Sequence, residues 1–349
     1  MKTVTDTALV VLGVLILSVL PGGAVELKLK WQPGKRYVVE NTSDSFAKMP
    51  LPGQGMIETK GRLALRVHND VSAHEKGVKV GYSYASVKMR QEMQGLVMEY
   101  DSSDPSKGGG LLGPVLQPLT EIRFAAIYDK EGQLVETEGL DEVQGADQLG
   151  MGKEELEAMA RQSSQFLPDK EVKPGDSWKT EVDLPMGGIG GKVTIDYTLK
   201  LEGIVEQEGR EVARISISGR TKEGDAKEGD AKEGEEVLKT EVKEATGTML
   251  FDIGLGQPLE VATTILLETG LPAGIPQAEG APGKMPLKTV SVAKLIGVED
   301  LKEAASGSKG ESKAKAESTA PAPAENKEEK RARRKARKAR RKAEKAQPE

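Results

Sequence analysis

Histidine and cysteine carry much of the acid–base chemistry and metal binding in proteins, and this chain has few of them. It contains two histidines, His68 and His74, and no cysteine. The two imidazole rings lie across a predicted turn and could supply part of a zinc site, but no third ligand accompanies them. No G-x-S-x-G segment offers a serine nucleophile. We therefore interpret both histidines as solvated loop residues and expect no metal site.

A glycine-rich stretch, Gly187–Lys192, resembles a phosphate-binding loop at first sight. The motif fails because Met186 stands where its first glycine is needed, and Val193 stands where its hydroxyl residue is needed. A strand is also predicted after the lysine, where the motif needs the N-terminus of a helix. We interpret the stretch as a hairpin loop and expect no cofactor.

The chain has 55 acidic residues, so a pair of carboxylates suited to hydrolysis could be assembled from many positions. Aromatic residues, on which sugar substrates stack, make up only 3% of the chain. The sequence therefore favours a protein that is not an enzyme, and a hydrolase is kept as an alternative.

The C-terminal residues carry the strongest charge pattern. Between Lys327 and Lys345 there are 12 basic and 3 acidic residues, a net charge of +9, whereas the whole chain has −5. An acidic body therefore carries a basic tail. Basic side chains would occupy every face of a helix formed there, so we expect the tail to stay unfolded until it meets an anion. The residues predicted to bind polyanions are Arg331, Arg333, Arg334, Lys335, Arg337, Lys338, Arg340, Arg341 and Lys342.

Anionic envelope lipid or an anionic polymer fits this tail as a partner, and such binding should weaken with salt. No aromatic residue is interleaved for base stacking, so sequence-specific nucleic-acid binding is not expected. The alternative is a tail that folds back onto the acidic body.

Alternation of apolar and polar residues predicts the elements of the body. From Lys192 to Glu202 the alternation is unbroken, and similar strands precede and follow it within residues 172–219. Short glycine-containing turns join them, so we predict an antiparallel meander. Residues 153–166 are the one predicted helix, with Leu156, Met159, Ala160 and Ser163 on one face.

The expected fold is therefore mainly β (α+β), with antiparallel meander sheets and one packed helix. A curved sheet, a half-barrel and a sandwich all fit this pattern. Residues 102–118 are rich in glycine and proline and have an apolar centre. We interpret them as a loop packed onto the sheet, with a flap over an apolar groove as the alternative.

Composition divides the chain into three parts. Residues 1–24 have the basic start, short apolar run and small residues of a cleavable signal peptide, with cleavage expected after Ala24. Residues 25–298 form the predicted β-rich domain, with a disordered charged loop at 222–236. Residues 299–349 form a predicted disordered linker and basic tail. The chain is therefore expected outside the cytoplasm, in the periplasm or secreted.

Repeated patterns suggest two related halves, residues 25–138 and 170–298. A Pro-Gly-x-x-aromatic pattern opens a strand in each half, and an aromatic-Asp pair followed by Gly-Gln occurs later in each. These are Pro33–Tyr37 with Pro174–Trp178, and Tyr128–Gln133 with Phe251–Gln257. The competing interpretation is that any chain rich in meanders repeats such turns.

The signal peptide and three motifs together resemble a family of exported bacterial proteins of unknown function. The motifs are W-x-P-G-x-x-Y at Trp31–Tyr37, P-G-D-x-W at Pro174–Trp178 and F-D-x-x-x-G at Phe251–Gly256. The resemblance covers residues 25–298. It implies a β-rich domain outside the cytoplasm and carries over no catalytic residue.

From these observations we expect an exported, non-enzymatic envelope protein whose basic tail docks on an anionic surface or polymer. A second expectation is a periplasmic carrier that binds an apolar ligand in a concave sheet. The hydrolase is the third.

Overall fold

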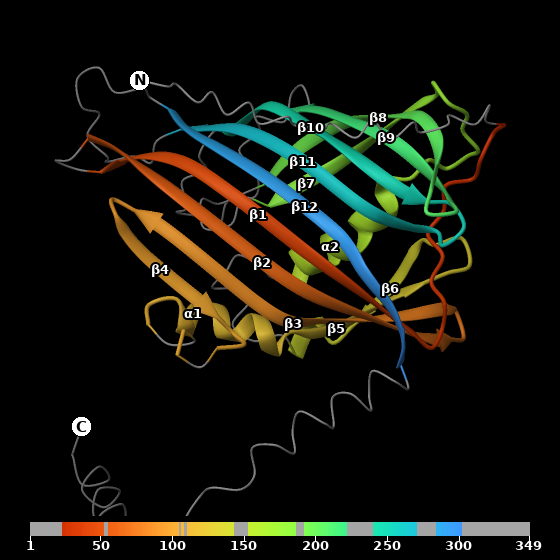
Figure 1. The fold of residues 1–349 in the computed structure, drawn as a ribbon, viewed down its shortest axis with the longest axis horizontal. Coiled ribbons are helices and arrows are strands. Elements are labelled where there is room, and N and C mark those ends of the chain that lie inside the picture. Colours follow the sequence, from red (N-terminus) through yellow and green to blue (C-terminus); the bar gives the residue numbers. More distant parts are fainter. Residues whose placement is uncertain are drawn as a thin grey trace, which may run out of the picture. The chain divides into compact units, whose positions relative to one another are not determined.

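Strands dominate the part of the chain that the structure describes. The computed structural model describes residues 23–51, 55–104, 106–107, 110–142, 153–185, 192–221, 240–270 and 284–301. Within them, twelve strands form one antiparallel open sheet with two short helices (Figure 1). The mainly β, antiparallel fold that the sequence predicts is confirmed. The strands are β1 Lys35–Leu51, β2 Gly55–His74, β3 Gly77–Met93, β4 Leu96–Asp101, β5 Arg123–Tyr128, β6 Leu134–Glu138, β7 Ser177–Pro185, β8 Lys192–Gln207, β9 Arg210–Thr221, β10 Thr240–Asp252, β11 Gln257–Gly270 and β12 Lys284–Asp300.

The order of the strands across the sheet differs from their order along the chain. It runs β6-β5-β3-β2-β1-β12-β11-β10-β9-β8-β7, and β4 pairs with β3 outside this path. The chain starts at the centre in β1, reaches one edge at β6, passes through helix α2 (Lys153–Gln165) and re-enters at the opposite edge in β7. It then returns to the centre, where β12 pairs with β1. Helix α2 lies close to both edge strands.

Strand β8 shows why the sheet has two different faces. Its five alternating apolar residues are buried, whereas the polar residues between them are partly or fully exposed. Successive side chains of a strand point to opposite sides, so this alternation separates a buried face from a solvated one. We call the face with the buried residues of β8 the inner face of the sheet, and its reverse the outer face. The cross-strand register carries this assignment from strand to strand.

The buried residues of the inner face form two hydrophobic clusters. One packs mainly on β7 to β11 and includes Leu199 and Phe251. The other packs mainly on β2 to β5 and includes Val80 and Tyr128, together with Leu156 of α2. The two clusters therefore lie toward the two lateral ends of the inner face and leave its central strands between them.

Helix α2 forms where the sequence predicts a helix. Leu156 and Ala160, one helical turn apart, are buried against the sheet, whereas Met159 is 44% exposed. The prediction that Met159 shares the buried face is therefore wrong. The helix contacts the sheet through a narrow stripe of side chains that includes Leu156 and Ala160. Met159 lies outside this stripe.

Two short helical turns replace part of the loop predicted at 102–118. Helix α1 (Gly113–Leu116) is followed by a 3-10 turn (Gln117–Glu121), and proline lies in the first turn of each. Proline is tolerated there because the N–H groups of a first turn have no partner within the helix. Leu116 and Leu119 are buried, so the segment packs onto the sheet as expected.

The turns that open β1 and β7 are built alike. The N–H of Gly34 donates to the carbonyl of Val71 on β2 at 2.8 Å, and that of Gly175 donates to Leu201 on β8 at 2.7 Å. Both glycines have positive φ, 86° and 96°, a conformation that favours residues without a Cβ. The later turns differ by one residue, since Gly132 donates to the carbonyl of Asp129, three positions earlier, whereas Gly256 donates to that of Asp252, four positions earlier. Only the opening turns are alike, and the two related halves stay a hypothesis.

Several predicted features lie outside the described residues. They are residues 1–22 of the signal peptide, the charged loop at 222–236, Gly187–Gly191 and residues 302–349 of the tail. Strand β12 continues to Asp300, two residues past the predicted end of the domain. In the part of the chain that is described, no helix combines the length and the apolar character needed to span a bilayer.

Candidate functional site

The two histidines lie on one strand and are too far apart to share a metal ion. Both belong to β2, six residues apart, which corresponds to about 20 Å along a strand. His68 is partly buried within the strand, so the prediction that it is a solvated loop residue is wrong. His74 ends the strand, and its Nδ1 accepts a hydrogen bond from the N–H of Lys76 at 3.3 Å. Among the described residues, no three acidic or histidine side chains are grouped to hold a metal.

His68 lies beside an ion pair on the outer face. Arg36 donates to both carboxylate oxygens of Asp70, at 2.6 and 2.7 Å. Burial lowers the pKa of His68, and the positive charge of Arg36 lowers it further. The imidazole is therefore held in its neutral form by its surroundings, and we assign it no chemical role.

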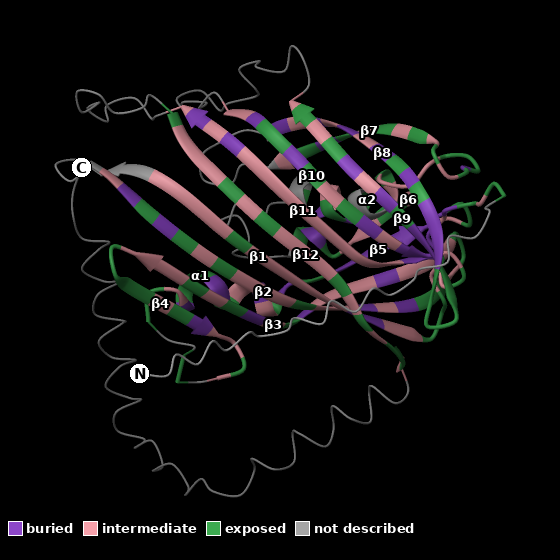
Figure 2. Cartoon of the chain, turned by 45° about the horizontal axis from the view of Figure 1, so that its top comes forward, coloured by how far each residue is buried: buried purple, intermediate pink, exposed green. Residues whose placement is uncertain are grey.

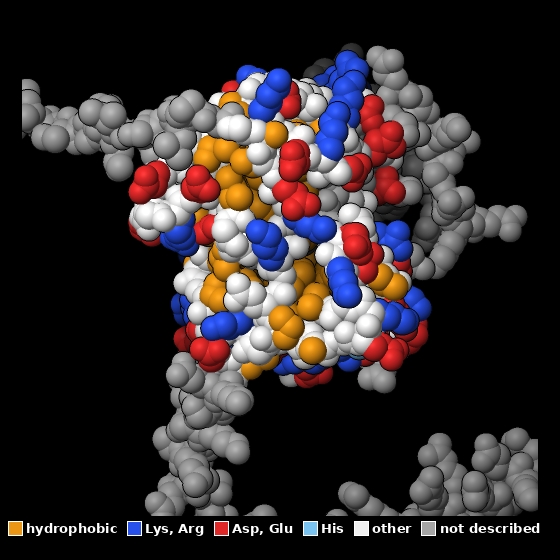
Figure 3. Space-filling model, turned by 90° about the vertical axis from the view of Figure 1, so that its right-hand side faces the viewer, with side chains coloured by type: hydrophobic (Ala, Val, Ile, Leu, Met, Phe, Trp, Pro, Cys, Tyr) orange, Lys and Arg blue, Asp and Glu red, His pale blue; other side chains and the backbone are white. Residues whose placement is uncertain are grey.

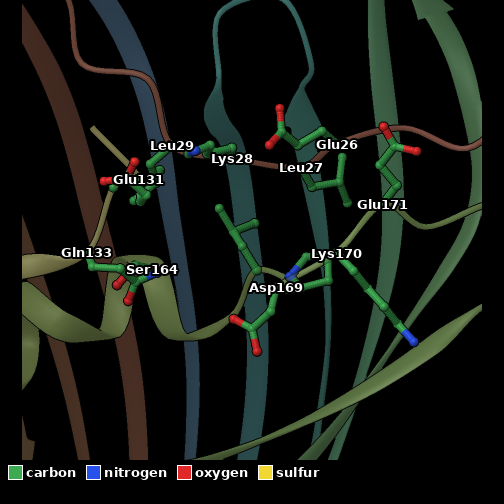
Figure 4. A pocket seen from close by; sticks show the side chains of 13 residues that line it. Glu26, Leu27, Lys28, Leu29, Glu131, Gln133, Ser164, Asp169, Lys170 and Glu171 are labelled. Atoms are coloured by element: carbon green, nitrogen blue, oxygen red, sulfur yellow. The ribbon is translucent and has the colours of Figure 1, made fainter. Parts of the chain in front are cut away.

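A small polar pocket lies where residues 26–29, the turn between β5 and β6 and the segment after α2 meet. Its volume is about 220 Å³, below the roughly 300 Å³ at which small-molecule sites usually begin. Figure 4 shows the carboxylates of Glu26, Asp169 and Glu171 pointing in different directions. Hydrolysis by paired acids needs two carboxylates that face one reacting bond, and these three do not provide such a pair.

The outer face of the central strands carries charged side chains that pair between neighbouring strands. Each such exposed pair contributes only about 0–1 kcal/mol to stability. The pairs are Arg36–Asp70, Arg62–Asp44, Arg66–Glu40, Lys48–Glu58 and Lys294–Glu260. The same face also carries apolar side chains, among them Val290 on β12, which lies opposite Asp44 and is 37% exposed.

The inner face of the same strands is apolar and only partly covered. Val39 on β1 lies between Val67 on β2 and Leu295 on β12 in the cross-strand register. Intermediate burial runs along much of β1 and β12 (Figure 2). We call the partly buried apolar residues on this side of β2, β1, β12 and β11 the central inner face. They are Val39, Leu63, Leu65, Val67, Val261, Ile265, Leu287 and Leu295.

Short polar side chains separate these apolar residues. Ser291 on β12 donates a hydrogen bond to Ser43 on β1, with 3.1 Å between the two Oγ atoms. Thr263 on β11 lies opposite Ser291 in the register. Serine and threonine do not reach as far from the sheet as leucine or phenylalanine. The central inner face therefore combines apolar walls with hydroxyl groups and is suited to an apolar guest.

Five of the chain's twelve aromatic residues gather at one end of the central inner face, near the start of β1. Trp31 packs edge-on against Tyr37 with 5.1 Å between ring centroids, and Tyr82 stacks on Phe124 at 4.8 Å. The hydroxyl oxygens of Tyr82 and Tyr128 lie 2.7 Å apart. We call these five residues the ring cluster. On the side of the molecule that is to the right in Figure 1, apolar side chains are exposed between charged ones (Figure 3).

The sequence raises an apolar ligand in a concave sheet but does not single out the residues of the central inner face, because their alternating strands look the same as strands that bury a core. The nine residues predicted to bind polyanions, from Arg331 to Lys342, lie outside the described residues, so the structure brings none of them to a site.

Solved structures show only distant similarity to this chain. A structure titled "Lipid-protein interactions in lipovitellin" matches with a TM-score of 0.45 and 12% identity, over 85% of this chain and 27% of that one. DynF from the dynemicin biosynthesis pathway of Micromonospora chersina matches with a TM-score of 0.18 and 10% identity, over 79% of this chain and 86% of the DynF chain. OpdL of Pseudomonas aeruginosa matches with a TM-score of 0.14 and 8% identity, over 76% of this chain and 99% of the OpdL chain. The chain thus spans little more than a quarter of the lipovitellin chain.

No curated protein sequence matches the chain. A family model matches residues 75–255, slightly more than half of the 349 residues, and its family is described as one of unknown function. The matched residues run from the turn before β3 to the turn after β10. The prediction of an uncharacterised β-rich family is confirmed. The chain belongs to the family of unknown function DUF6263.

Proposed function

We propose that this chain is a non-enzymatic binding protein that holds an apolar ligand against the central inner face. One observation carries the proposal: eight apolar side chains on four adjacent strands remain partly exposed, between two clusters that are fully buried. Contiguous apolar surface of this kind on a soluble protein marks a binding site, because its exposure to water is unfavourable.

The proposal is tested with two matched substitutions to glutamine. Leu65 on β2 points to the inner face, and Leu266 on β11 is also partly buried but points to the outer face. Leu65→Gln places an amide in the proposed site, and we expect the dye Nile red to bind roughly tenfold more weakly. Leu266→Gln should leave its affinity within about twofold. Equal losses in the two variants, or no binding by the unaltered chain, would contradict the proposal.

A second candidate function rests on the charge of the tail. We propose that residues 326–349 dock on an anionic lipid or polymer outside the cytoplasm, with the signal peptide removed after Ala24. The net charge of +9 between Lys327 and Lys345 supports this role. Deleting residues 326–349 should abolish salt-sensitive retention on vesicles that contain anionic lipid, and unchanged retention would contradict the proposed docking.

N-terminal sequencing of the exported chain should begin at Val25. The hydrolase alternative gains no support from the polar pocket.

A further inference from the structure

Two buried polar atoms near the ring cluster have no hydrogen-bond partner within the described structure. They are the indole Nε1 of Trp31, which is a donor, and the amide Oδ1 of Asn69, which is an acceptor. The Asn69 side chain is only 8% exposed. Buried polar atoms without partners are rare in folded proteins because their desolvation is not compensated, so each needs an explanation.

Both atoms belong to the same end of the inner face. Asn69 lies on β2 between the apolar positions Val67 and Val71, directly opposite Tyr37 on β1 and Tyr82 on β3. The Trp31 ring packs edge-on against that same Tyr37. Trp31 and Asn69 are therefore both neighbours of Tyr37.

Each hydroxyl group of the ring cluster already has at least one hydrogen-bond partner. The hydroxyl of Tyr37 accepts a hydrogen bond from the N–H of Gln32 at 3.3 Å. Tyr128 donates to the carbonyl of Ala160 at 2.8 Å, and its oxygen lies 2.7 Å from that of Tyr82. Among the buried side-chain polar atoms of the described residues, only Trp31 Nε1 and Asn69 Oδ1 lack any hydrogen-bond partner.

We propose that these two atoms hold the uncharged hydroxyl head of a long-chain apolar ligand. A hydroxyl oxygen can accept from Trp31 Nε1 while its hydrogen is donated to Asn69 Oδ1. The chain of the ligand then follows the inner side of β2 past Val67 and Leu65 to Leu63, a rise of about 20 Å from Asn69. This inference rests on the proposed function and adds the chemical class of the ligand.

The same geometry disfavours an ionised fatty acid. A carboxylate only accepts hydrogen bonds, so it would leave Asn69 Oδ1 facing an anion in a desolvated site. The nearest charged group on β2, Asp70, is on the outer face and pairs with Arg36 there. The site should therefore separate alcohols from acids of equal chain length.

The test compares dodecanol, dodecanoate and dodecane on the full chain at about pH 8, where the acid is ionised. Each compound displaces Nile red, and the affinities are expressed relative to that of dodecane. We expect dodecanol to bind roughly tenfold more tightly than dodecanoate. Asn69→Leu and Trp31→Phe should each remove most of the advantage of dodecanol over dodecane. Asn41→Leu, an inner-face asparagine of β1 that is outside the ring cluster, should leave that ratio unchanged.

The outcomes separate the two proposals. If none of the three compounds binds, the proposed function fails. If dodecanol and dodecane bind alike and Asn69→Leu leaves their ratio unchanged, the hydroxyl site is refuted while the apolar site stands. In that case the two polar atoms share only an internal water, and the substitution alters stability alone. Should Asn69→Leu fail to fold, Trp31→Phe decides the question, because it keeps a ring in place and removes only the donor.

Discussion

At the scale of single residues, Tyr128 links the sheet to helix α2. Its hydroxyl donates a hydrogen bond to the Ala160 carbonyl and lies next to the hydroxyl of Tyr82. Burial raises the pKa of Tyr128 to about 12, so the group stays protonated and can donate at neutral pH. The link joins two elements that are distant in the chain.

Replacing Tyr128 by phenylalanine should lower the free energy of unfolding by about 1–3 kcal/mol, because it leaves buried partners without their hydrogen bonds. Urea unfolding followed by circular dichroism measures the change. Tyr84→Phe is the matched control, since Tyr84 is also buried but its hydroxyl has no hydrogen-bond partner within the described residues. We expect it to cost less than about 0.5 kcal/mol. Equal effects would show that the hydroxyl link contributes nothing.

His68 should make the stability depend on pH. Its pKa is lowered in the folded chain, first by burial and then by Arg36, so the unfolded chain binds a proton more readily. The free energy of unfolding should therefore decrease as the pH falls below about 6.5, the ordinary pKa of histidine, and stop decreasing below the folded pKa. In His68→Gln this part of the dependence should be absent. Unfolding curves between about pH 5 and 7.5 measure it, and identical slopes in the two chains would refute the assignment.

Only part of this residue-scale picture could be predicted from the sequence. Trp31 and Tyr37 stood out in the strand-opening motif. Asn69 is a polar residue at a position where the alternation of β2 calls for an apolar one, and this irregularity was the available signal. The missing hydrogen-bond partner of Asn69 Oδ1 and the packing of Trp31 against Tyr37 both arise only in the folded chain, so the sequence alone could not identify the two unpaired atoms.

At the scale of elements, α2 is held mainly by a few buried side chains. Leu156→Ala should destabilise the chain by about 2–5 kcal/mol, because it removes a completely buried side chain from the cluster on β2 to β5. Met159→Ala, on the exposed side of the same helix, should cost less than about 1 kcal/mol. Urea midpoints of the two variants make the comparison. A larger effect at Met159 would mean that the helix packs through a different face.

The strands and α2 could be predicted because their periodicities are local properties of the sequence. The alternation in β8 and the spacing of Leu156 and Ala160 each lie within a few residues. The short helix α1 was missed because its Gly113-Pro114 start has the composition of a loop, and its helical turn depends on packing Leu116 against the sheet.

At the scale of the whole described domain, the central pairing of β1 with β12 joins residues about 250 positions apart in sequence, and no local pattern predicts it. Alternation also cannot distinguish an inner face that is filled from one that is left partly open. That difference arises because the two hydrophobic clusters cover the two lateral ends of the inner face, while short side chains such as Ser43 and Ser291 lie between them. The binding role follows from this arrangement and not from any motif.

The most direct test is native mass spectrometry of the full chain as purified, followed by organic extraction. The proposed function predicts a bound apolar molecule that extraction releases, with its occupancy strongly reduced in Leu65→Gln and retained in Leu266→Gln. A chain that carries no apolar molecule and takes up none when dodecanol is added would contradict it.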